Sequence, residues 1–454
     1  MEDKQIKRTN INREDDYSLR SILLFAWPIM LANILQITFN FADTLVVGNF
    51  VSERGLAAVG TTSPITIFFI WGLNGLSLGA NVLISRMIGA REDKKLPSAV
   101  FSAMTIGLVF GIGVAIFGIV TAPWLLRMLS VPEDIFAQAL LYMRIYFLAS
   151  IGIGVFDFGA SILRADGNSK DPTLYLGISG VLNVLLNLLF VALFSWGVAG
   201  AALASVISQV VAATLILMKL MKEEGMIGLK RDLSLFDLNL AITMLKYGIP
   251  SALQNQLFSF SNMMIQSSIN SFGSLFVAAN TAANAIEEYV YVFVDAFPLA
   301  ALTYTSRMYG AKRYKDIFKM TLEVFVICGL GAFVIGFFIL LNGNFFLGLL
   351  SSDQELVSLG LYRLKYVTFF LFLNGLLDVI VNSIRGMGIV TLPTIVTLFG
   401  VCGFRILYIY TYFSSHHDPK TLYLCFPFSW LLTMMIQLPI WYMRYKQINT
   451  LKGN

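Results

Sequence analysis

The chain contains twelve apolar runs, each long enough to cross a lipid bilayer as an α-helix. A helix rises about 1.5 Å per residue, so about 20 residues cross roughly 30 Å of hydrocarbon. A strand of a membrane barrel would need only about ten residues and would alternate in polarity, so the runs predict helices. Their approximate limits are 21–48, 57–85, 98–122, 136–163, 172–194, 197–218, 241–271, 276–306, 317–341, 356–384, 390–413 and 421–443.

The composition excludes a soluble globular protein. Hydrophobic residues make up 57% of the chain and charged residues only 13%, which indicates an all-α protein of the cell membrane with many spans. The net charge of +5 is weak support for nucleic-acid binding, and we expect none. Residues 1–20 lack a short apolar segment with a cleavage site, so we expect no cleaved signal peptide. The three cysteines lie inside apolar runs and suggest neither a disulfide framework nor a metal site.

The positions of the basic residues predict the orientation. If both termini face the cytoplasm, the tails and inner loops hold 25 of the 32 lysine and arginine residues, and the outer loops hold three. Cytoplasmic loops of membrane proteins carry this excess. Four further basic residues fall within or at the ends of the predicted spans: Arg144, Arg363, Lys365 and Arg405.

The sequence contains an internal repeat. Residues 84–91 (Ile-Ser-Arg-Met-Ile-Gly-Ala-Arg) return 221 positions later as residues 305–312 (Thr-Ser-Arg-Met-Tyr-Gly-Ala-Lys). The same offset relates the pattern Arg-x-x-Gly-x-x-x-x-Pro-Thr at 164–173 to its second copy at 385–394. One register held over this distance indicates two halves of six helices each.

Because six is an even number, the two halves are expected to have the same orientation, related by a pseudo-two-fold axis along the membrane normal with a cleft between them. The predicted parts of the chain are a cytoplasmic tail (1–20), an N-lobe (21–218), a cytoplasmic linker (219–240), a C-lobe (241–443) and a second cytoplasmic tail (444–454).

These motifs, together with Phe-Ala-Asp-Thr-Leu-Val-Val-Gly at 41–48, resemble the multidrug and toxic compound extrusion (MATE) family over essentially the whole chain. The resemblance implies a secondary active exporter that exchanges a cytoplasmic organic cation for H⁺ or Na⁺ by alternating access. The expected partners are small organic substrates and membrane lipid, the chain is expected to be a monomer, and no cofactor beyond the coupling ion is implied. The phosphate-binding pattern G-x-x-x-x-G-K-[ST] is absent, in agreement with transport that uses no ATP.

Polar residues form one face of the first span and a matching face of the seventh. Charged and polar side chains are costly in lipid, so we expect these faces to line the cleft. Asp43 is the titratable member and is interpreted as the coupling-ion residue, with a structural ion pair or hydrogen bond as the alternative. The two faces consist of Asn33, Gln36, Asn40 and Asp43, and of Asn255, Ser259, Asn262 and Gln266.

The resemblance also implies a partner set for Asp43. In ion-coupled members of the family, the first-span Asp is joined by an Asn and an Asp in span 5 and by a Thr in span 6. This chain has Asn183, Asn187 and Ser205 at those positions. The loss of one carboxylate weakens Na⁺ binding and favours H⁺ as the coupling ion, with Na⁺ as the less favoured alternative. Helix-to-helix hydrogen bonds without an ion are the other interpretation of the two asparagines.

Span 8 is the most acidic predicted helix. Glu287 or Glu288, Tyr291 and Asp295 follow one side of it. Acids beside aromatic rings suit a flat organic cation, so these residues are interpreted as substrate or proton residues. Packing against Arg or Lys from another span is the alternative. Adjacent helical residues point about 100° apart, so only one of the two glutamates is expected to face the cleft.

Asp378 has a repeat mate, Asp157, and each lies seven residues before a repeated arginine, Arg385 or Arg164. We interpret this symmetric pair as architectural, with substrate contact as the second possibility.

The sequence also bears on two other functional classes. An enzyme is not expected, because the only histidines are His416 and His417 in an outer loop and the patterns H-E-x-x-H and G-x-S-x-G are absent. A flippase for lipid-linked saccharides or lipids, from the wider superfamily, shares the helix repeat and remains the alternative function. Such proteins usually have more spans and a more cationic cleft.

Overall fold

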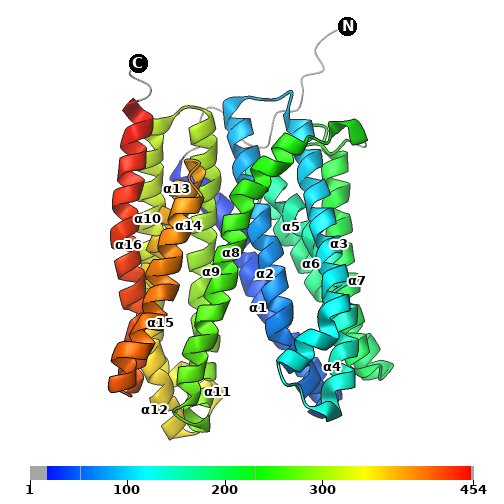
Figure 1. Cartoon of the computed structure of the whole chain (residues 1–454), viewed down its shortest axis with the longest axis vertical. Coiled ribbons are helices and arrows are strands. Elements are labelled where there is room, and N and C mark those ends of the chain that lie inside the picture. The colour runs from blue at the N-terminus through cyan, green and yellow to red at the C-terminus, as the bar shows by residue number, and fades with distance from the viewer. Residues whose placement is uncertain (1–17, 52, 231, 451–454) are drawn as a thin grey trace. The chain divides into compact units, whose positions relative to one another are not determined.

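A computed structural model describes residues 18–51, 53–230 and 232–450. For residues 40, 41, 43–45, 47 and 53 it describes the backbone but not the side chains. The regular secondary structure of this part of the chain is entirely helical, and it contains no strand (Figure 1). The helices of the first half are α1 (Leu19–Phe50), α2 (Glu53–Ala90), α3 (Leu96–Met128), α4 (Glu133–Tyr146), α5 (Ala149–Ala165), α6 (Lys170–Asn187), η1 (Leu188–Leu193), α7 (Gly197–Lys222) and η2 (Leu233–Leu235).

The second half has more helical breaks than the first. Several of its helices continue into one another through wider π-helical turns, η3, η4 and η5. Its helices are α8 (Leu238–Asn270), α9 (Ser274–Gly310), α10 (Tyr314–Leu341), α11 (Gly343–Leu350), α12 (Gln354–Arg363), η3 (Leu364–Thr368), α13 (Leu371–Gly386), α14 (Thr391–Thr397), η4 (Leu398–Gly403), α15 (Phe404–Tyr408), η5 (Ile409–Phe413) and α16 (Pro419–Thr450).

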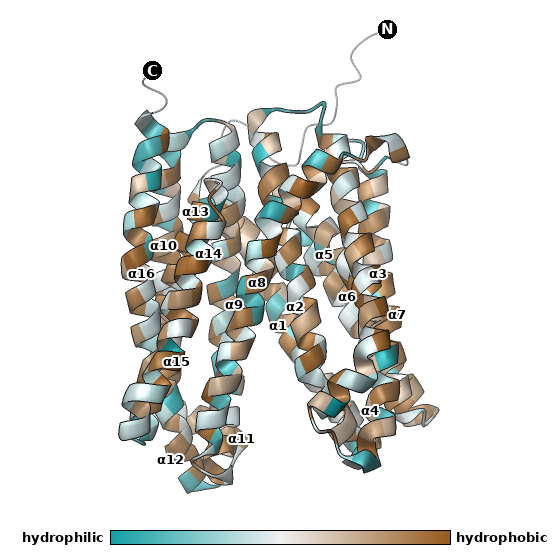
Figure 2. Ribbon diagram, in the orientation of Figure 1, coloured by the Kyte–Doolittle hydropathy of each residue, from teal (hydrophilic) through white to brown (hydrophobic). Residues whose placement is uncertain are grey.

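Ten helical segments of the described chain are long and apolar enough to cross a membrane. They correspond to ten of the twelve predicted runs. The other two runs, 241–271 and 276–306, form the long helices α8 and α9, of 33 and 37 residues. Polar and charged side chains interrupt these two helices, and Figure 2 shows hydrophilic residues part way along both. Their length therefore agrees with the prediction, but their composition does not qualify them as spans.

The described chain forms two compact units. Unit 1 contains residues 31–252, and unit 2 contains residues 18–30 and 253–450. The divisions fall inside helices α1 and α8, each two residues after a proline, Pro28 or Pro250. The two positions are 222 residues apart, which matches the offset of the sequence repeat. The predicted linker contains η2 and belongs to unit 1.

Each unit is built around one helix that is buried along most of its length. In unit 1 this helix is α5, which packs against α2, α3 and α7. In unit 2 it is α13, which packs against α9, α10 and α16. The two helices occupy equivalent positions of the repeat. Small residues permit the close packing: a Cβ on Gly107 of α3 would meet the carbonyl oxygen of Gly154 on α5.

The beginning of α1 packs in unit 2, far from its own half in the sequence. Ile22, Phe25 and Ile29 are buried in a cluster with residues of α9, α10 and α13. The Phe25 and Tyr304 rings meet edge to face with centroids 5.6 Å apart. The Tyr304 hydroxyl donates a hydrogen bond of 3.2 Å to the carbonyl oxygen of Ser21. These contacts join residues about 280 positions apart into one core.

Helices α2 and α8 approach each other closely inside unit 1. A Cβ on Gly79 would collide with the backbone of Met244 and Gly248, and a Cβ on Gly248 would collide with the backbone of Leu76. Backbone atoms cannot move aside as flexible side chains can. The crossing of these two helices therefore requires glycine at both positions.

We expect Gly79→Ala to destabilise the protein by about 1–3 kcal/mol, because the added methyl group forces the two backbones apart. Gly60→Ala is the matched control: Gly60 lies on the same helix and no atom lies within 4 Å of its added Cβ. The thermal unfolding midpoint in detergent should fall for Gly79→Ala and not for Gly60→Ala. Equal midpoints for the two variants would contradict the close crossing.

Candidate functional site

The three predicted coupling residues of spans 5 and 6 lie together in unit 1. The Asn187 side-chain amide donates to Asn183 Oδ1 at 3.3 Å, and the Asn183 amide donates to Ser205 Oγ at 3.5 Å. Asn187 is buried, while Asn183 and Ser205 are half-buried. Helices α6 and α7 thus bring two amides and a hydroxyl into one chain of hydrogen bonds.

The predicted polar face of α1 is described only in part. Asn33 is half-buried and Gln36 is exposed. The side chains of Asn40 and Asp43 lie outside the described residues, although the backbone of α1 is helical through both positions. The coupling role of Asp43 therefore stays a prediction from the sequence.

The polar face of α8 makes its described contacts within unit 2. Asn255 is half-buried, and Asn262 and Gln266 are exposed. Arg405 Nη1 donates to Asn262 Oδ1 at 3.5 Å, and the Gln266 amide donates to Asn270 Oδ1 at 2.9 Å. Asn262 and Gln266 remain exposed despite these contacts.

Glu287 forms a buried ion pair with Arg363. Arg363 Nη2 lies 2.9 Å from Glu287 Oε1, and Arg363 Nε donates to Oε2 at 3.0 Å. The exposed fraction is 3% for the side chain of Glu287 and 8% for that of Arg363. This is the contact described by the alternative interpretation of Glu287, packing against an arginine of another helix.

The remaining polar atoms around this pair are also bonded. Arg363 donates to the side-chain oxygens of Asn280 at 2.9 Å and of Asn284 at 2.7 Å. Thr368 donates to Glu287 at 3.0 Å, and Tyr423 donates to Asn280 at 2.9 Å. The network links α9, α12, η3 and α16, so it ties four segments of unit 2 together. A buried ion pair is tolerated only when its other donors and acceptors are satisfied in this way.

The next acidic residues of α9 differ in exposure. Glu288 is exposed although its neighbour Glu287 is buried, as expected for adjacent helical positions. Tyr291 is half-buried and packs against the hydrophobic core of unit 2. Asp295 is exposed, one turn further along the helix. Asp295 and Glu288 are therefore the acids of α9 that a ligand can reach.

Asp295 of α9 and Asp378 of α13 interact electrostatically. Asp378 is half-buried and accepts a hydrogen bond from the Asn374 amide at 3.1 Å. It also interacts with Arg385, which donates to Gln254 Oε1 at 2.7 Å. Two carboxylates held in one region make its electrostatic potential more negative, which favours binding of a cation.

The repeat mate of Asp378 has a similar environment in unit 1. Asp157 and Arg164 both lie on α5 and interact electrostatically, as Asp378 and Arg385 do on α13. Among the described residues, neither aspartate forms a direct ion pair with its arginine. The two pairs lie on the two central helices, and the architectural interpretation stays a prediction.

From the sequence alone, two of the buried arginines, Arg363 and Arg405, receive no role. Arg405 donates through Nε to Ser429 at 3.0 Å, and its guanidinium lies 4.4 Å from the Phe426 ring centroid. The sequence does mark both residues as unusual, because they are among the four basic residues that fall within or at the ends of predicted spans. An intramembrane arginine requires a partner, and the sequence does not identify which one.

A family model described as MatE matches residues 28–189 and 250–411, one match in each half of the repeat. The probable multidrug resistance protein YpnP of Bacillus subtilis (strain 168) is 29% identical over 375 residues, with 82% of this chain and 83% of that protein covered. The probable multidrug resistance protein YoeA of the same organism is 26% identical, with 85% of each covered. The multidrug export protein MepA of Staphylococcus aureus (strain MRSA252) is 23% identical, with 79% of each covered.

Solved structures share the fold. The outward-facing conformation of a multidrug resistance MATE family transporter of the MOP superfamily matches with a TM-score of 0.88 at 22% identity, covering 99% of this chain and 100% of that chain. A MOP superfamily transporter from Pyrococcus furiosus matches with a TM-score of 0.86 at 22% identity, covering 96% and 97%. At this level of identity, the likeness concerns the fold.

We expect Glu287→Gln to lower the free energy of unfolding by about 3–5 kcal/mol, because it leaves the Arg363 charge buried without its counter-charge. The double variant Glu287→Leu/Arg363→Met should recover much of this loss, since it removes both charges. Glu288→Gln is the control, because Glu288 is exposed. Unfolding by SDS titration measures all three, and an unchanged stability of Glu287→Gln would contradict a structural role for the pair.

Proposed function

The chain belongs to the MATE family of membrane transporters, whose model matches both of its halves, and on this basis we propose that it is a secondary active multidrug exporter. It exchanges organic compounds, in particular aromatic cations, for H⁺ by alternating access. The proposal rests mainly on the match of the family model to each half of the chain. Relatives described as multidrug resistance and multidrug export proteins support the substrate class.

The proposal includes the arrangement in the membrane. Helices α8 and α9 cross the bilayer together with the ten candidate spans, which gives six spans to each half. Both helices are longer than the roughly 20 residues that a span needs. The protein lies in the cell membrane with both termini on the cytoplasmic side, as the distribution of lysine and arginine favours.

The choice of a cationic substrate rests on the acids of unit 2. Glu287 is occupied by Arg363, whereas Asp295 is exposed and interacts with Asp378. Such acids attract a cation and repel an anion more strongly in a medium of low dielectric than in water. Tyr291 lies one helical turn from Asp295, so an aromatic ring accompanies the charge.

The choice of H⁺ rests on unit 1. The hydrogen-bonded series Asn187–Asn183–Ser205 offers neutral oxygen atoms and contains no carboxylate. With Asp43 as the one acid of the set, the site has too little negative charge to favour Na⁺. A single carboxylate surrounded by neutral groups binds and releases one proton instead.

The flippase alternative requires cationic groups that bind a phosphate. Unit 2 does hold buried arginines, but Arg363 is neutralised by Glu287, and Arg405 lies against Ser429 and the Phe426 ring. The exposed charged groups on α9 are acids, Glu288 and Asp295. These observations favour an organic cation over a lipid-linked phosphate.

We expect Asp43→Asn to abolish substrate export driven by a pH gradient while the protein still folds, because the variant keeps the size of the side chain and removes its proton. Proteoliposomes with an imposed pH or Na⁺ gradient and a fluorescent cation provide the measurement. Glu133→Gln, an exposed acid at the start of α4, is the control. Full transport by Asp43→Asn would eliminate this residue as the coupling site, and transport driven only by Na⁺ in the parent protein would reject H⁺.

We expect Asp295→Asn to lower the apparent affinity for monovalent aromatic cations by about tenfold, and that for neutral drugs much less, because only cations lose a charge interaction. Glu323→Gln on α10, an acid 3.9 Å from Lys319, serves as the control. Transport assays with one cationic and one neutral dye compare the two classes. An equal loss for both dyes would assign Asp295 to proton transfer or packing, and a preference of the parent protein for anions would reject the cation exporter.

A further inference from the structure

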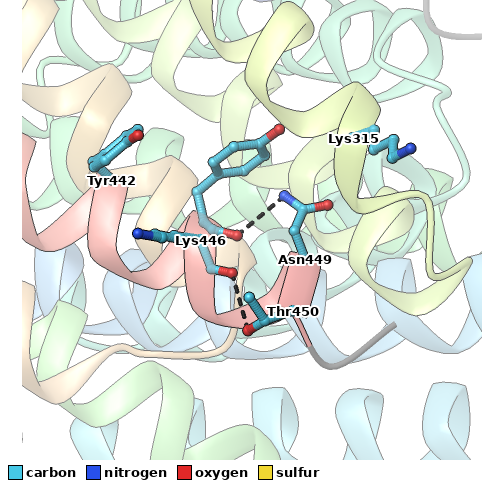
Figure 3. Close-up of a pocket in the computed structure, with 6 residues that line it drawn as sticks. Lys315, Tyr442, Lys446, Asn449 and Thr450 are labelled. Atoms are coloured by element: carbon cyan, nitrogen blue, oxygen red, sulfur yellow. Dashed lines mark hydrogen bonds between the residues drawn. The ribbon is translucent and has the colours of Figure 1, made fainter. Parts of the chain in front are cut away.

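A pocket of about 450 Å³ lies at one end of unit 2, between the first turn of α10 and the last turns of α16. Figure 3 shows Lys315 of α10 on one side of it and Tyr442, Lys446, Asn449 and Thr450 of α16 on the other. Tyr445 completes the lining. Both helices are candidate membrane spans, so their ends mark the boundary between lipid and water. The pocket therefore lies where lipid headgroups are found.

The two lysines give the pocket a positive charge that the described protein does not neutralise. Neither Lys315 nor Lys446 forms an ion pair with any residue that the structure describes. The acids nearest in sequence on α10 are already paired: Asp316 with Arg313 at 2.6 Å, and Glu323 with Lys319 at 3.9 Å. The pocket is thus complementary to an anion.

Fixed side chains form the wall of the pocket. The Tyr445 ring stacks on Trp441 with centroids 5.9 Å apart and contacts Phe318 of α10 at 5.5 Å. Trp441 is held in turn by a hydrogen bond of 2.9 Å from Nε1 to Ser383 Oγ. These contacts hold the ends of α10 and α16 together without a ligand.

The side chains of Asn449 and Thr450 donate hydrogen bonds to backbone carbonyl oxygens that would otherwise repel an anion. The Asn449 amide donates to the Tyr445 carbonyl oxygen at 3.1 Å, and the Thr450 hydroxyl donates to the Gln447 carbonyl oxygen at 2.8 Å (Figure 3 shows the first). The last carbonyl groups of a helix carry partial negative charge, which these bonds partly compensate.

An apolar row leads away from the pocket along α10. Its members are exposed by 40–61% and follow one another at intervals of four residues, which places them on one face of the helix. The row begins three residues after Lys315 and consists of Phe318, Leu322, Val326 and Leu330. A charged pocket that continues into an exposed apolar row fits a molecule with an anionic head and acyl chains.

The other half of the repeat lacks this combination. The offset of 221 residues pairs Lys315 with Lys94. Helix α7 is the last long helix of the first half, as α16 is of the second, and at its end Lys219 is bound to Asp171 at 3.2 Å and to Glu223 at 3.3 Å. The lysine that faces the neighbouring helix at the end of α7 is therefore neutralised, unlike the two lysines of the pocket.

We propose that this pocket binds the headgroup of an anionic phospholipid, with Lys315 and Lys446 contacting the phosphate and the α10 row contacting an acyl chain. Basic pockets between membrane helices bind acidic headgroups in this way. None of the residues that line the pocket is among the predicted coupling or substrate residues.

Native mass spectrometry of the detergent-purified protein tests the proposal with added phosphatidylglycerol or phosphatidylcholine. We expect more bound phosphatidylglycerol than phosphatidylcholine, and about a tenfold loss of phosphatidylglycerol binding in Lys315→Gln/Lys446→Gln. Lys94→Gln/Lys222→Gln removes the same charge from exposed positions of the first half and should bind as the parent does. Lys315→Arg/Lys446→Arg keeps the charge and should retain binding, which separates loss of charge from loss of folding.

Three results would overturn the proposal. Equal binding of the two lipids would remove the role of the anionic headgroup. An equal loss in both glutamine double variants would show a general charge effect and no site at this pocket. Displacement of phosphatidylglycerol by millimolar inorganic phosphate would identify a site for free anions instead of lipid.

Discussion

Hydrocarbon provides no hydrogen-bond partner, and this constraint underlies both the helices and the contacts of the charged groups. Every backbone amide in a span must be bonded within the chain, which the long helices achieve. Every charge must find a partner in the protein or face an aqueous cavity. The contacts of Glu287 and Arg363 with each other and with their polar neighbours satisfy this condition at one place in unit 2. Under the proposed function, the acids without such partners are the ones assigned to transport.

The two halves of the repeat satisfy the constraint differently. Six charged residues of the described chain are buried; five of them belong to unit 2, and Asp166 is the exception in unit 1. Interior polar contacts between the helices of unit 1 instead use hydroxyl and amide groups, as between Ser77 and Ser161 and between Asn183 and Ser205. The repeat thus preserves the helix arrangement while the chemistry has diverged. The proposed function accordingly assigns proton coupling to one half and substrate selection to the other.

The sequence predicts the helices well because the thickness of a bilayer fixes their length and hydropathy. It also predicts the association of Asn183, Asn187 and Ser205, through the resemblance to a family pattern. It does not predict the partner of Glu287. Arg363 lies 76 residues away, and the relative rotation of α9 and α12 that brings them together depends on packing that no local pattern records. Length alone predicts α8 and α9 as spans, whereas their polar side chains keep them outside the ten candidate spans of the described chain.

The packing of the first turns of α1 within unit 2 has a consequence for the order of folding. Ile22, Phe25 and Ile29 leave the ribosome first, but their partners on α9 come about 280 residues later. At a synthesis rate of about 5–20 residues per second, this delay is roughly a quarter of a minute to a minute. Throughout that time the start of α1 must be accommodated by lipid or by an insertion factor, with its apolar face unmatched. The core of unit 2 therefore closes after translation has passed its midpoint, and premature termination in the second half leaves the first helix without its native neighbours.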